Sequence, residues 1–296
     1  MLKIWLLETR PQYLLLSVIL AFLGTCIAWY DKGAMHLGWA LLAGFGLVLT
    51  HISVNTLNDY FDYKSGVDLK TERTPFSGGS GILKAGLLKP AQVLGMGIVT
   101  LLLAAPIGIY FILIQGWLLL PLLIVAALCV VLYTPVILKH TWPEWSAGLG
   151  LGMLPVLGTY FSQTGTYSWV VFFGSVPSFI LVHNLLLLNE FPDVGADSSV
   201  GRKTLPITMG MGKTAKFYAA MTVLTYVWIG GCVALQIAPL WTLLAFLSLP
   251  FAVMAMRGSF RYDHRETLIA AMKNNVLVVL ATQFLLGLGY LLAAVR

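Results

Sequence analysis

The stretch AQVLGMGIVTLLLAAPIGIYFILI, which runs from Ala91 to Ile114, decides the fold class of this chain. It contains no Asp, Glu, Lys or Arg, and a helix of about 20 apolar residues is long enough to cross a hydrocarbon core of about 30 Å. The runs from Leu14 to Trp29 and from Val276 to Val295 are equally free of charge. A buried helix of a soluble protein rarely needs that length, so these runs predict a protein embedded in a lipid bilayer.

The composition of the chain supports the same interpretation. Hydrophobic residues make up 58% of it and charged residues only 10%, whereas soluble globular chains carry about 25% charged residues. The three cysteines, Cys26, Cys129 and Cys232, are scattered through apolar segments. This spacing argues against a disulfide framework and against a zinc site.

Nine apolar segments are predicted to span the membrane. Together they predict an all-α integral membrane bundle that forms a single domain over residues 1–296. The segments cover residues 11–30, 36–58, 91–114, 117–138, 144–163, 168–190, 214–235, 239–256 and 269–294.

The charges in the loops set the predicted orientation. With nine spans, all of the 18 Lys and Arg residues except Lys32 and Arg296 fall on one side of the membrane. Positively charged loops remain in the cytoplasm, so we expect a cytoplasmic amino terminus and an external carboxyl terminus. The net charge of +6 therefore reflects topology. Because no Lys/Arg run resembles a nucleic-acid patch, we expect no nucleic-acid partner.

Acidic residues gather beside two long cytoplasmic connections, at about 59–90 and 191–213, which follow the second and sixth spans. The first cluster has polar side chains at helical spacing, which places them on one face; they are Asn55, Asn58, Asp59 and Asp62. Gly66 gives the backbone freedom to leave the helix. Asp68 is then able to fold back toward the same site.

The second cluster contains Asn189, Asp193 and Asp197, spaced four residues apart. These three side chains share one face if the helix continues through them. Pro192 opposes that continuation, because proline removes a helix hydrogen bond and often kinks the helix. The sequence leaves both alternatives open.

Two carboxylate clusters of this kind are suited to a divalent metal and a diphosphate. Mg²⁺ takes oxygen ligands and usually binds one or two carboxylates together with phosphates and waters. Basic residues that follow the clusters are expected to contact phosphate oxygens; they are Lys64, Lys70, Arg73, Arg202 and Lys203. The alternative is an ordinary solvated loop. Two matched clusters at helix ends, with asparagines inside apolar segments, favour a site.

At these residues the chain resembles the UbiA superfamily of intramembrane prenyltransferases. The Asn-Asp-x-x-Asp motif of that family is matched by Asn58, Asp59 and Asp62, and its Asp-x-x-x-Asp motif by Asp193 and Asp197. The resemblance extends over the whole chain. It implies a Mg²⁺ cofactor, a polyprenyl diphosphate substrate, and a catalytic and metal-binding role for these four aspartates, with Asp68 as a further metal ligand.

One branch of the superfamily is most similar, the 1,4-dihydroxy-2-naphthoate polyprenyltransferases of menaquinone synthesis (MenA-like). Asp68 lies six residues after Asp62, as in that branch, whereas many members have the acid four residues after, where this chain has Gly66. The stretches 77–81 (SGGSG) and 201–205 (GRKTL) are also similar to it. The sequence departs from that branch at Glu190-Phe191-Pro192, where Asn and Arg are more usual.

Other polar residues have two interpretations each. The resemblance implies that Tyr133 and Lys139 lie near the diphosphate, while an interfacial tyrosine and a topological lysine are the alternative. His183 and Asn184 lie within the sixth predicted span. A hydrogen bond between helices is expected for each of them, and a role in the pocket is the alternative.

The sequence and the resemblance together predict Mg²⁺-dependent transfer of a polyprenyl group to an aromatic acceptor at a cytoplasm-facing site in the cell membrane. The acceptor that the resemblance implies is 1,4-dihydroxy-2-naphthoate, in menaquinone biosynthesis. Asn55, Asn58 and Asn189 are expected to bind substrate. Alternatives within the superfamily are a terpene cyclase that acts on the prenyl diphosphate alone and a transferase for a different quinone or lipid acceptor. A transporter predicts acids spread through several spans, which this sequence does not have.

Overall fold

The fold is a bundle of helices, seen in a computed structural model that describes residues 1–140 and 142–295. No strand occurs within those ranges, which confirms the all-α prediction. Long apolar helices are the expected form of such a chain, because a helix satisfies its own backbone hydrogen bonds where no water is available. Arg296, which we predict on the outer side of the membrane, lies outside the described residues.

The helical elements alternate between long apolar helices and short segments in the connections. In chain order they are α1 (Leu2–Glu8), α2 (Pro11–Lys32), α3 (Leu37–Ser65), α4 (Val67–Lys70), α5 (Pro90–Gln115), η1 (Trp117–Leu119), α6 (Leu120–Leu132), η2 (Ile137–Lys139), α7 (Glu144–Ala147), the π-helix η3 (Gly148–Met153), α8 (Leu154–Thr164), α9 (Trp169–Asn189), α10 (Val194–Ser198), α11 (Leu205–Met209), α12 (Met211–Ala234), η4 (Leu240–Ser248), α13 (Leu249–Ser259) and α14 (Arg265–Ala294).

Seven helices of the described chain are long and apolar enough to cross a membrane. They are α2, α3, α5, α9, α12, the continuous pair η4–α13, and α14. The other two predicted spans have a different form. Residues 117–138 contain a shorter apolar helix, Trp117–Leu132, and residues 144–163 contain the successive segments α7, η3 and α8. The seven long helices therefore support an integral membrane protein, while the number of nine membrane spans stays a prediction.

The helix of the second span continues beyond the predicted membrane segment, as the helical spacing of the first cluster predicts. The segment was expected to end near residue 58, while α3 continues to Ser65. The polar residues that follow Asn58 extend the same helix, since their backbone hydrogen bonds do not depend on how apolar the side chains are. The helix ends at Gly66, which adopts φ 78° as its C-cap.

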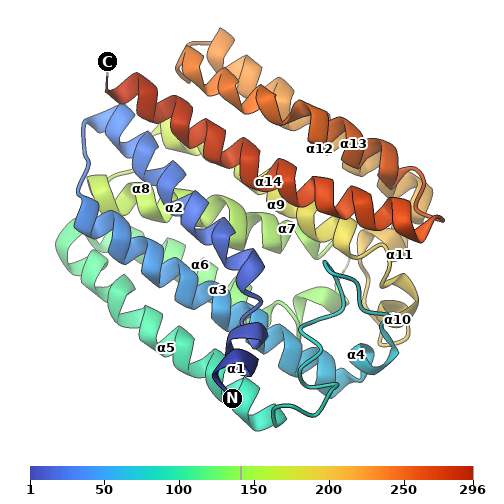
Figure 1. Cartoon of the computed structure of the whole chain (residues 1–296). Helices are drawn as coiled ribbons and strands as arrows, with labels where there is room; N and C mark the ends of the chain where they lie inside the picture. Colours follow the sequence, from blue (N-terminus) through green and yellow to red (C-terminus); the bar gives the residue numbers. More distant parts are fainter. Residues whose placement is uncertain (141, 296) are drawn as a thin grey trace.

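The long helices pack side by side (Figure 1). Helix α5 forms one edge and α12 with α13 the other, while α3, α2 and α14 lie between them. Helix α3 packs along α5, α2 along α14 and α8, and α9 along η3 and α12. The two chain ends lie at opposite ends of the bundle, and α4, α10 and α11 gather at the same end as α1.

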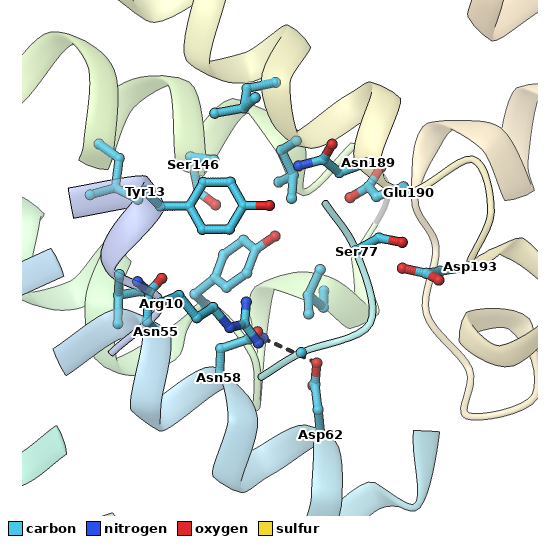
Figure 2. A pocket seen from close by; sticks show the side chains of 18 of the residues that line it. Arg10, Tyr13, Asn55, Asn58, Asp62, Ser77, Ser146, Asn189, Glu190 and Asp193 are labelled. Atoms are coloured by element: carbon cyan, nitrogen blue, oxygen red, sulfur yellow. Dashed lines mark hydrogen bonds between the residues drawn. The ribbon is translucent and has the colours of Figure 1, made fainter. Parts of the chain in front are cut away.

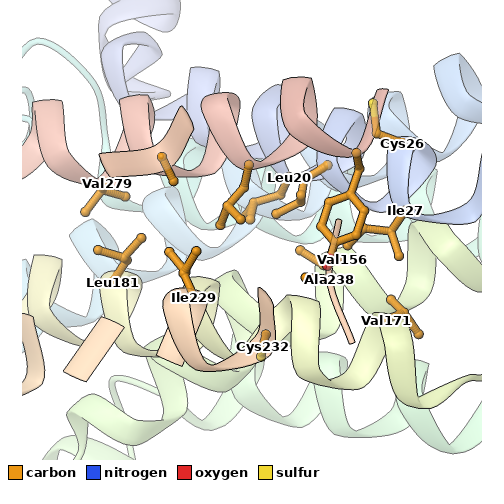
Figure 3. Close-up of a cluster of buried hydrophobic side chains, with 14 of the residues drawn as sticks. Leu20, Cys26, Ile27, Val156, Val171, Leu181, Ile229, Cys232, Ala238 and Val279 are labelled. Carbon is orange, nitrogen blue, oxygen red and sulfur yellow. The ribbon is translucent and has the colours of Figure 1, made fainter. Parts of the chain in front are cut away.

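The largest apolar cluster is formed where α2, α8, α9, α12 and α14 meet (Figure 3). Leu20, Ile27 and Val156 in this cluster are fully buried. Cys26 and Cys232 also belong to it, and all three cysteines are buried and free. By contrast, α5 exposes large apolar side chains such as Leu102 and Leu113, as expected of a helix that faces lipid.

Candidate active site

A cavity lies between the ends of the helices that carry the two acidic clusters (Figure 2). Its polar lining comes from both clusters and from the segments around them: Arg10, Tyr13, His51, Asn55, Asn58, Asp62, Asp68, Ser77, Tyr133, Ser146, Asn189, Glu190, Asp193, Asp197 and Arg202. Its remaining wall is apolar and includes Leu16, Val130, Leu151, Val182 and Leu186. The cavity therefore joins a charged end to an apolar end.

Helix α3 presents the first cluster along one face, as its spacing predicts. Asn58 Nδ2 donates to Asp62 Oδ2 at 3.2 Å and to Thr134 Oγ1 at 3.0 Å, so it ties α3 to the chain that follows α6. Asn55 Nδ2 donates to the carbonyl oxygen of Thr9 at 3.0 Å. Both asparagines line the cavity, and both also fix neighbouring segments.

Asp59 is placed differently from its neighbours. It is 1% exposed and is not among the residues that line the cavity. One of its carboxylate oxygens pairs with the guanidinium of Arg10, and the other accepts the backbone N–H of Ser80 at 2.9 Å. Because both oxygens are already used within the protein, Asp59 holds the amino-terminal segment and the glycine-rich loop against α3.

Asp68 folds back toward the cavity, as we expected. Gly66 ends α3 in the left-handed region, and the short helix α4 then carries Asp68 into the lining. Burial raises the pKa of Asp68, while the positive charges of Arg10, Arg202 and Lys84 oppose that rise.

The second cluster does not lie on one continuous helix. Helix α9 ends at Asn189, a turn contains Pro192, and α10 begins after Asp193. Asn189, Asp193 and Asp197 nevertheless all line the cavity. Burial, with the nearby charge of Asp197, raises the pKa of Asp193 to about 7, although Arg202 opposes the shift. The turn that contains Pro192 therefore brings these three side chains to the same cavity, although they do not share one continuous helix.

Arg202 connects the two clusters. Its Nη2 pairs with Asp62 of the first cluster, and its Nη1 donates to Asp197 of the second at 2.8 Å. Its side chain is only 12% exposed. Buried charges of one sign require compensation, and this guanidinium supplies it to both clusters at once.

The glycine-rich stretch 77–81 closes one side of the cavity. Gly78, Gly79 and Gly81 all have positive φ, which glycine adopts without the steric cost that other residues meet. A Cβ at Gly79 would lie 3.3 Å from Arg10, Asp59 and Asp68 side chains. The loop thus approaches the first cluster too closely for a larger residue.

Comparison with known proteins identifies the family of this chain. The UbiA prenyltransferase family matches residues 17–292 of the chain. The chain belongs to the UbiA prenyltransferase family. It is a prenyltransferase enzyme, and the predicted family is confirmed.

Curated relatives of this UbiA-family chain carry a common name. It is 32% identical over 292 residues to the 1,4-dihydroxy-2-naphthoate octaprenyltransferase of Bacillus subtilis (strain 168), which covers 97% of this chain and 92% of the relative. It is 26% identical over 309 residues to the protein of that name from Escherichia coli (strain K12), covering 98% and 95% respectively. These relatives agree with the MenA-like branch.

Solved UbiA structures share the fold. The apo structure of a UbiA homolog from Aeropyrum pernix K1 has a TM-score of 0.69 at 16% identity, over 90% of this chain and 95% of that one. A UbiA homolog from Archaeoglobus fulgidus bound to GPP and Mg²⁺ has a TM-score of 0.63 at 14% identity, over 96% and 99%. At these identities the likeness concerns the fold.

The acids of this UbiA-family chain fit a hard cation in their donor chemistry. Asp62, Asp68, Asp193 and Asp197 line one cavity and offer oxygen ligands. Oδ1 of Asp193 is buried and has no hydrogen-bond partner, so an oxygen is available for a positive ligand. Among the described residues, no three Asp, Glu, His or Cys side chains already converge as a metal cluster, because Arg202 lies between the acids.

Most of the basic residues predicted to bind phosphate lie outside the cavity lining. Lys64 Nζ lies over the ring of Tyr60, 5.9 Å from its centroid, and Lys70 Nζ donates to Ser199 Oγ at 3.1 Å. Arg73 Nε donates to the carbonyl oxygen of Gly79 at 3.1 Å. Lys139 and Lys203 are also absent from the lining, whereas Arg202 and Tyr133 belong to it.

Several site residues were missed in the sequence, among them Arg10, Tyr13, His51, Ser146 and Glu190. Arg10 was counted only as a topological charge, and it has φ 54° at the junction of α1 and α2. Tyr13 donates its hydroxyl to the carbonyl oxygen of Phe76 at 2.9 Å. Glu190 was noted only as a departure from the branch. The signal available for Arg10, Tyr13 and Glu190 was their position at the end of a long apolar helix.

Of the two polar residues inside α9, Asn184 makes the helix–helix bond that we expected, whereas His183 bonds to the connection before α7. Asn184 Nδ2 donates to the carbonyl oxygen of Tyr218 and to Thr222 Oγ1, each at 3.0 Å. His183 Nε2 accepts the indole N–H of Trp142 at 2.8 Å. Neither residue lines the cavity.

Proposed function

We propose that this enzyme transfers a polyprenyl group from its diphosphate to 1,4-dihydroxy-2-naphthoate, with Mg²⁺ as cofactor, in menaquinone biosynthesis. The observation that carries the proposal is the cavity itself. Two acidic clusters and Arg202 line its charged end, and apolar side chains of α2, α6 and α9 line the other. The names of the curated relatives supply the acceptor.

The cavity separates the two ends of the donor substrate. The diphosphate lies at the charged end, where Arg202 offers two donors in a geometry that suits phosphate oxygens. The polyprenyl chain lies along the apolar wall. When bound, Mg²⁺ held by Asp62, Asp68, Asp193 and Asp197 supplies positive charge against the departing diphosphate.

Residues that line the cavity then position the reacting groups and exclude water. Tyr133 lines the cavity close to the charges of Asp62 and Arg202, so it contacts the region where the diphosphate leaves. The apolar wall keeps water from the allylic cation that remains. The carbon–oxygen bond to the diphosphate breaks to leave this cation and free diphosphate. The acceptor ring carbon that bears the carboxylate then forms a carbon–carbon bond to the cation, and loss of that carboxylate as carbon dioxide restores the aromatic ring.

Product analysis tests this function. Purified full-length protein is incubated with a prenyl diphosphate, Mg²⁺ and 1,4-dihydroxy-2-naphthoate, and the extract is analysed by mass spectrometry. A prenylated naphthoquinone that forms only with all components supports the proposal. A cyclised hydrocarbon that forms without the acceptor supports the terpene cyclase instead, and prenylation of another quinone or lipid precursor alone changes the acceptor.

We also propose nine membrane crossings, with the site on the cytoplasmic face of the cell membrane. The segments at 117–138 and 144–163 add two crossings to the seven long helices. An odd number agrees with chain ends at opposite ends of the bundle (Figure 1). A reporter fused after the carboxyl terminus is expected to be external. A cytoplasmic reporter signal contradicts the count.

A further inference from the structure

The cytoplasmic end of α9 changes from apolar to acidic along one face. Leu185 and Leu186 line the apolar wall of the cavity, Asn189 and Glu190 follow one turn later, and Asp193 lies at the charged end. Residues three and four apart lie on one helix face, so Glu190 stands at the boundary between the two ends. The reacting carbon of a prenyl diphosphate lies at that same boundary, because it joins the apolar chain to the diphosphate.

The carboxyl group of Glu190 is buried without a donor. Glu190 is 6% exposed, and neither Oε1 nor Oε2 accepts a hydrogen bond from an amide, hydroxyl or cation of the described residues. Figure 2 shows Asn189 and Glu190 reaching into the cavity beside Ser77 and Asp193. Buried polar atoms without partners cost free energy, so this carboxyl group has an unmet need for a hydrogen-bond donor.

A second buried carboxyl group, that of Glu144, lies behind Glu190. Glu144 is fully buried, and its Oε1 accepts the backbone N–H of Leu205 at 2.6 Å. Burial, with the neighbouring charge of Glu144, raises the pKa of Glu190 well above its usual range. A carboxyl group that resists ionisation is better suited to a neutral hydroxyl than to a further metal ion.

We propose that Glu190 accepts a hydrogen bond from an aromatic hydroxyl group of the acceptor and so selects hydroxylated rings. The inference rests on the proposed function. A hydroxyl held at the boundary places the ring beside the reacting carbon of the prenyl chain. Glu190 is then a specificity-determining residue, distinct from the aspartates proposed to bind metal.

A comparison of acceptors and variants tests the proposal. Full-length wild type, Glu190→Met and Glu190→Gln are assayed with 1,4-dihydroxy-2-naphthoate and with each of its two mono-O-methyl ethers. Methionine has a similar shape but accepts no comparable hydrogen bond, while glutamine keeps one acceptor oxygen. The control is Glu72→Ala, because Glu72 is an exposed residue that pairs with Arg265 outside the cavity.

We expect methylation of one hydroxyl to lower wild-type kcat/KM by about tenfold or more. Glu190→Met should lower kcat/KM for the dihydroxy acceptor by a similar factor and should no longer distinguish it from that ether. Glu190→Gln should retain part of the discrimination, and Glu72→Ala all of it. The KM for prenyl diphosphate and the Mg²⁺ concentration for half-maximal activity should not change.

Several outcomes overturn the proposal. They are undiminished discrimination in Glu190→Met, a raised Mg²⁺ requirement in that variant, and a wild type that uses hydroxy and methoxy acceptors equally. The last result needs no variant, so it decides the matter even if both substitutions prevent folding. A wild type that prenylates no aromatic acceptor contradicts the proposed function instead.

Discussion

Replacement of Arg202 by methionine removes a cation that the two acidic clusters share. Arg202 is 12% exposed, and its partners Asp62 and Asp197 have side chains that are 10% and 5% exposed. Removing one partner of a buried ion pair costs about 3–5 kcal/mol. We expect the lower end, about 3 kcal/mol, because the acids border a cavity that water reaches. In a chain of this size the loss lowers Tm on the order of 5–10 °C.

The assay is thermal unfolding in detergent, followed by tryptophan fluorescence, with and without Mg²⁺. The matched control is Arg265→Met, because Arg265 pairs with Glu72 at the surface, where the two side chains are 60% and 78% exposed. Exposed pairs contribute less than about 1 kcal/mol. Mg²⁺ should raise the Tm of Arg202→Met more than that of wild type, since the unpaired acids gain a cation.

Turnover should fall by about 100-fold or more in Arg202→Met, because a donor to the departing diphosphate is lost. The reasoning is refuted if Arg202→Met unfolds at the same temperature as Arg265→Met and responds to Mg²⁺ no more than wild type does.

Two further predictions concern the acids and the metal. Asp62→Ala and Asp193→Ala should each abolish transfer, and the double variant should be barely worse than either, because both residues line the cavity and serve one transition state. Near-normal turnover in both single variants would place the site elsewhere, and Asp263→Ala, outside the cavity, is the control that should keep its activity. Excess chelator should stop turnover and added Mg²⁺ should restore it, since the candidate ligands are oxygens; full activity in chelator would exclude the metal-dependent mechanism.

The fold class and the two clusters were predictable because they depend on local sequence. Uncharged runs determine membrane helices, and Asn58 and Asp62 share a face through helical spacing alone. Gly66 was expected to release the chain, and its positive φ at the end of α3 confirms that role. Asp68 was expected to fold back once the helix ended at Gly66, and it lines the same cavity as the second cluster.

Other features depend on contacts between distant segments. Arg10 reaches Asp59 because α1 and α2 meet at an unusual backbone conformation, which a hydrogen bond from Asn55 to Thr9 supports. A pattern of spacing along one helix contains no such information. Likewise, Lys70 follows the first cluster in sequence but contacts Ser199 instead of lining the cavity. A basic residue close to an acidic cluster was predicted to bind phosphate, but tertiary packing determines where its side chain lies.

The central claim is that one cavity holds the diphosphate between the two acidic clusters. The most direct test is a structure of the full-length protein with Mn²⁺ in place of Mg²⁺ and a prenyl thiolodiphosphate that does not ionise. The account predicts anomalous density for the metal between Asp62 or Asp68 and Asp193 or Asp197, with Arg202 on the diphosphate and the prenyl chain along Leu186. Metal or diphosphate bound outside this cavity would contradict it.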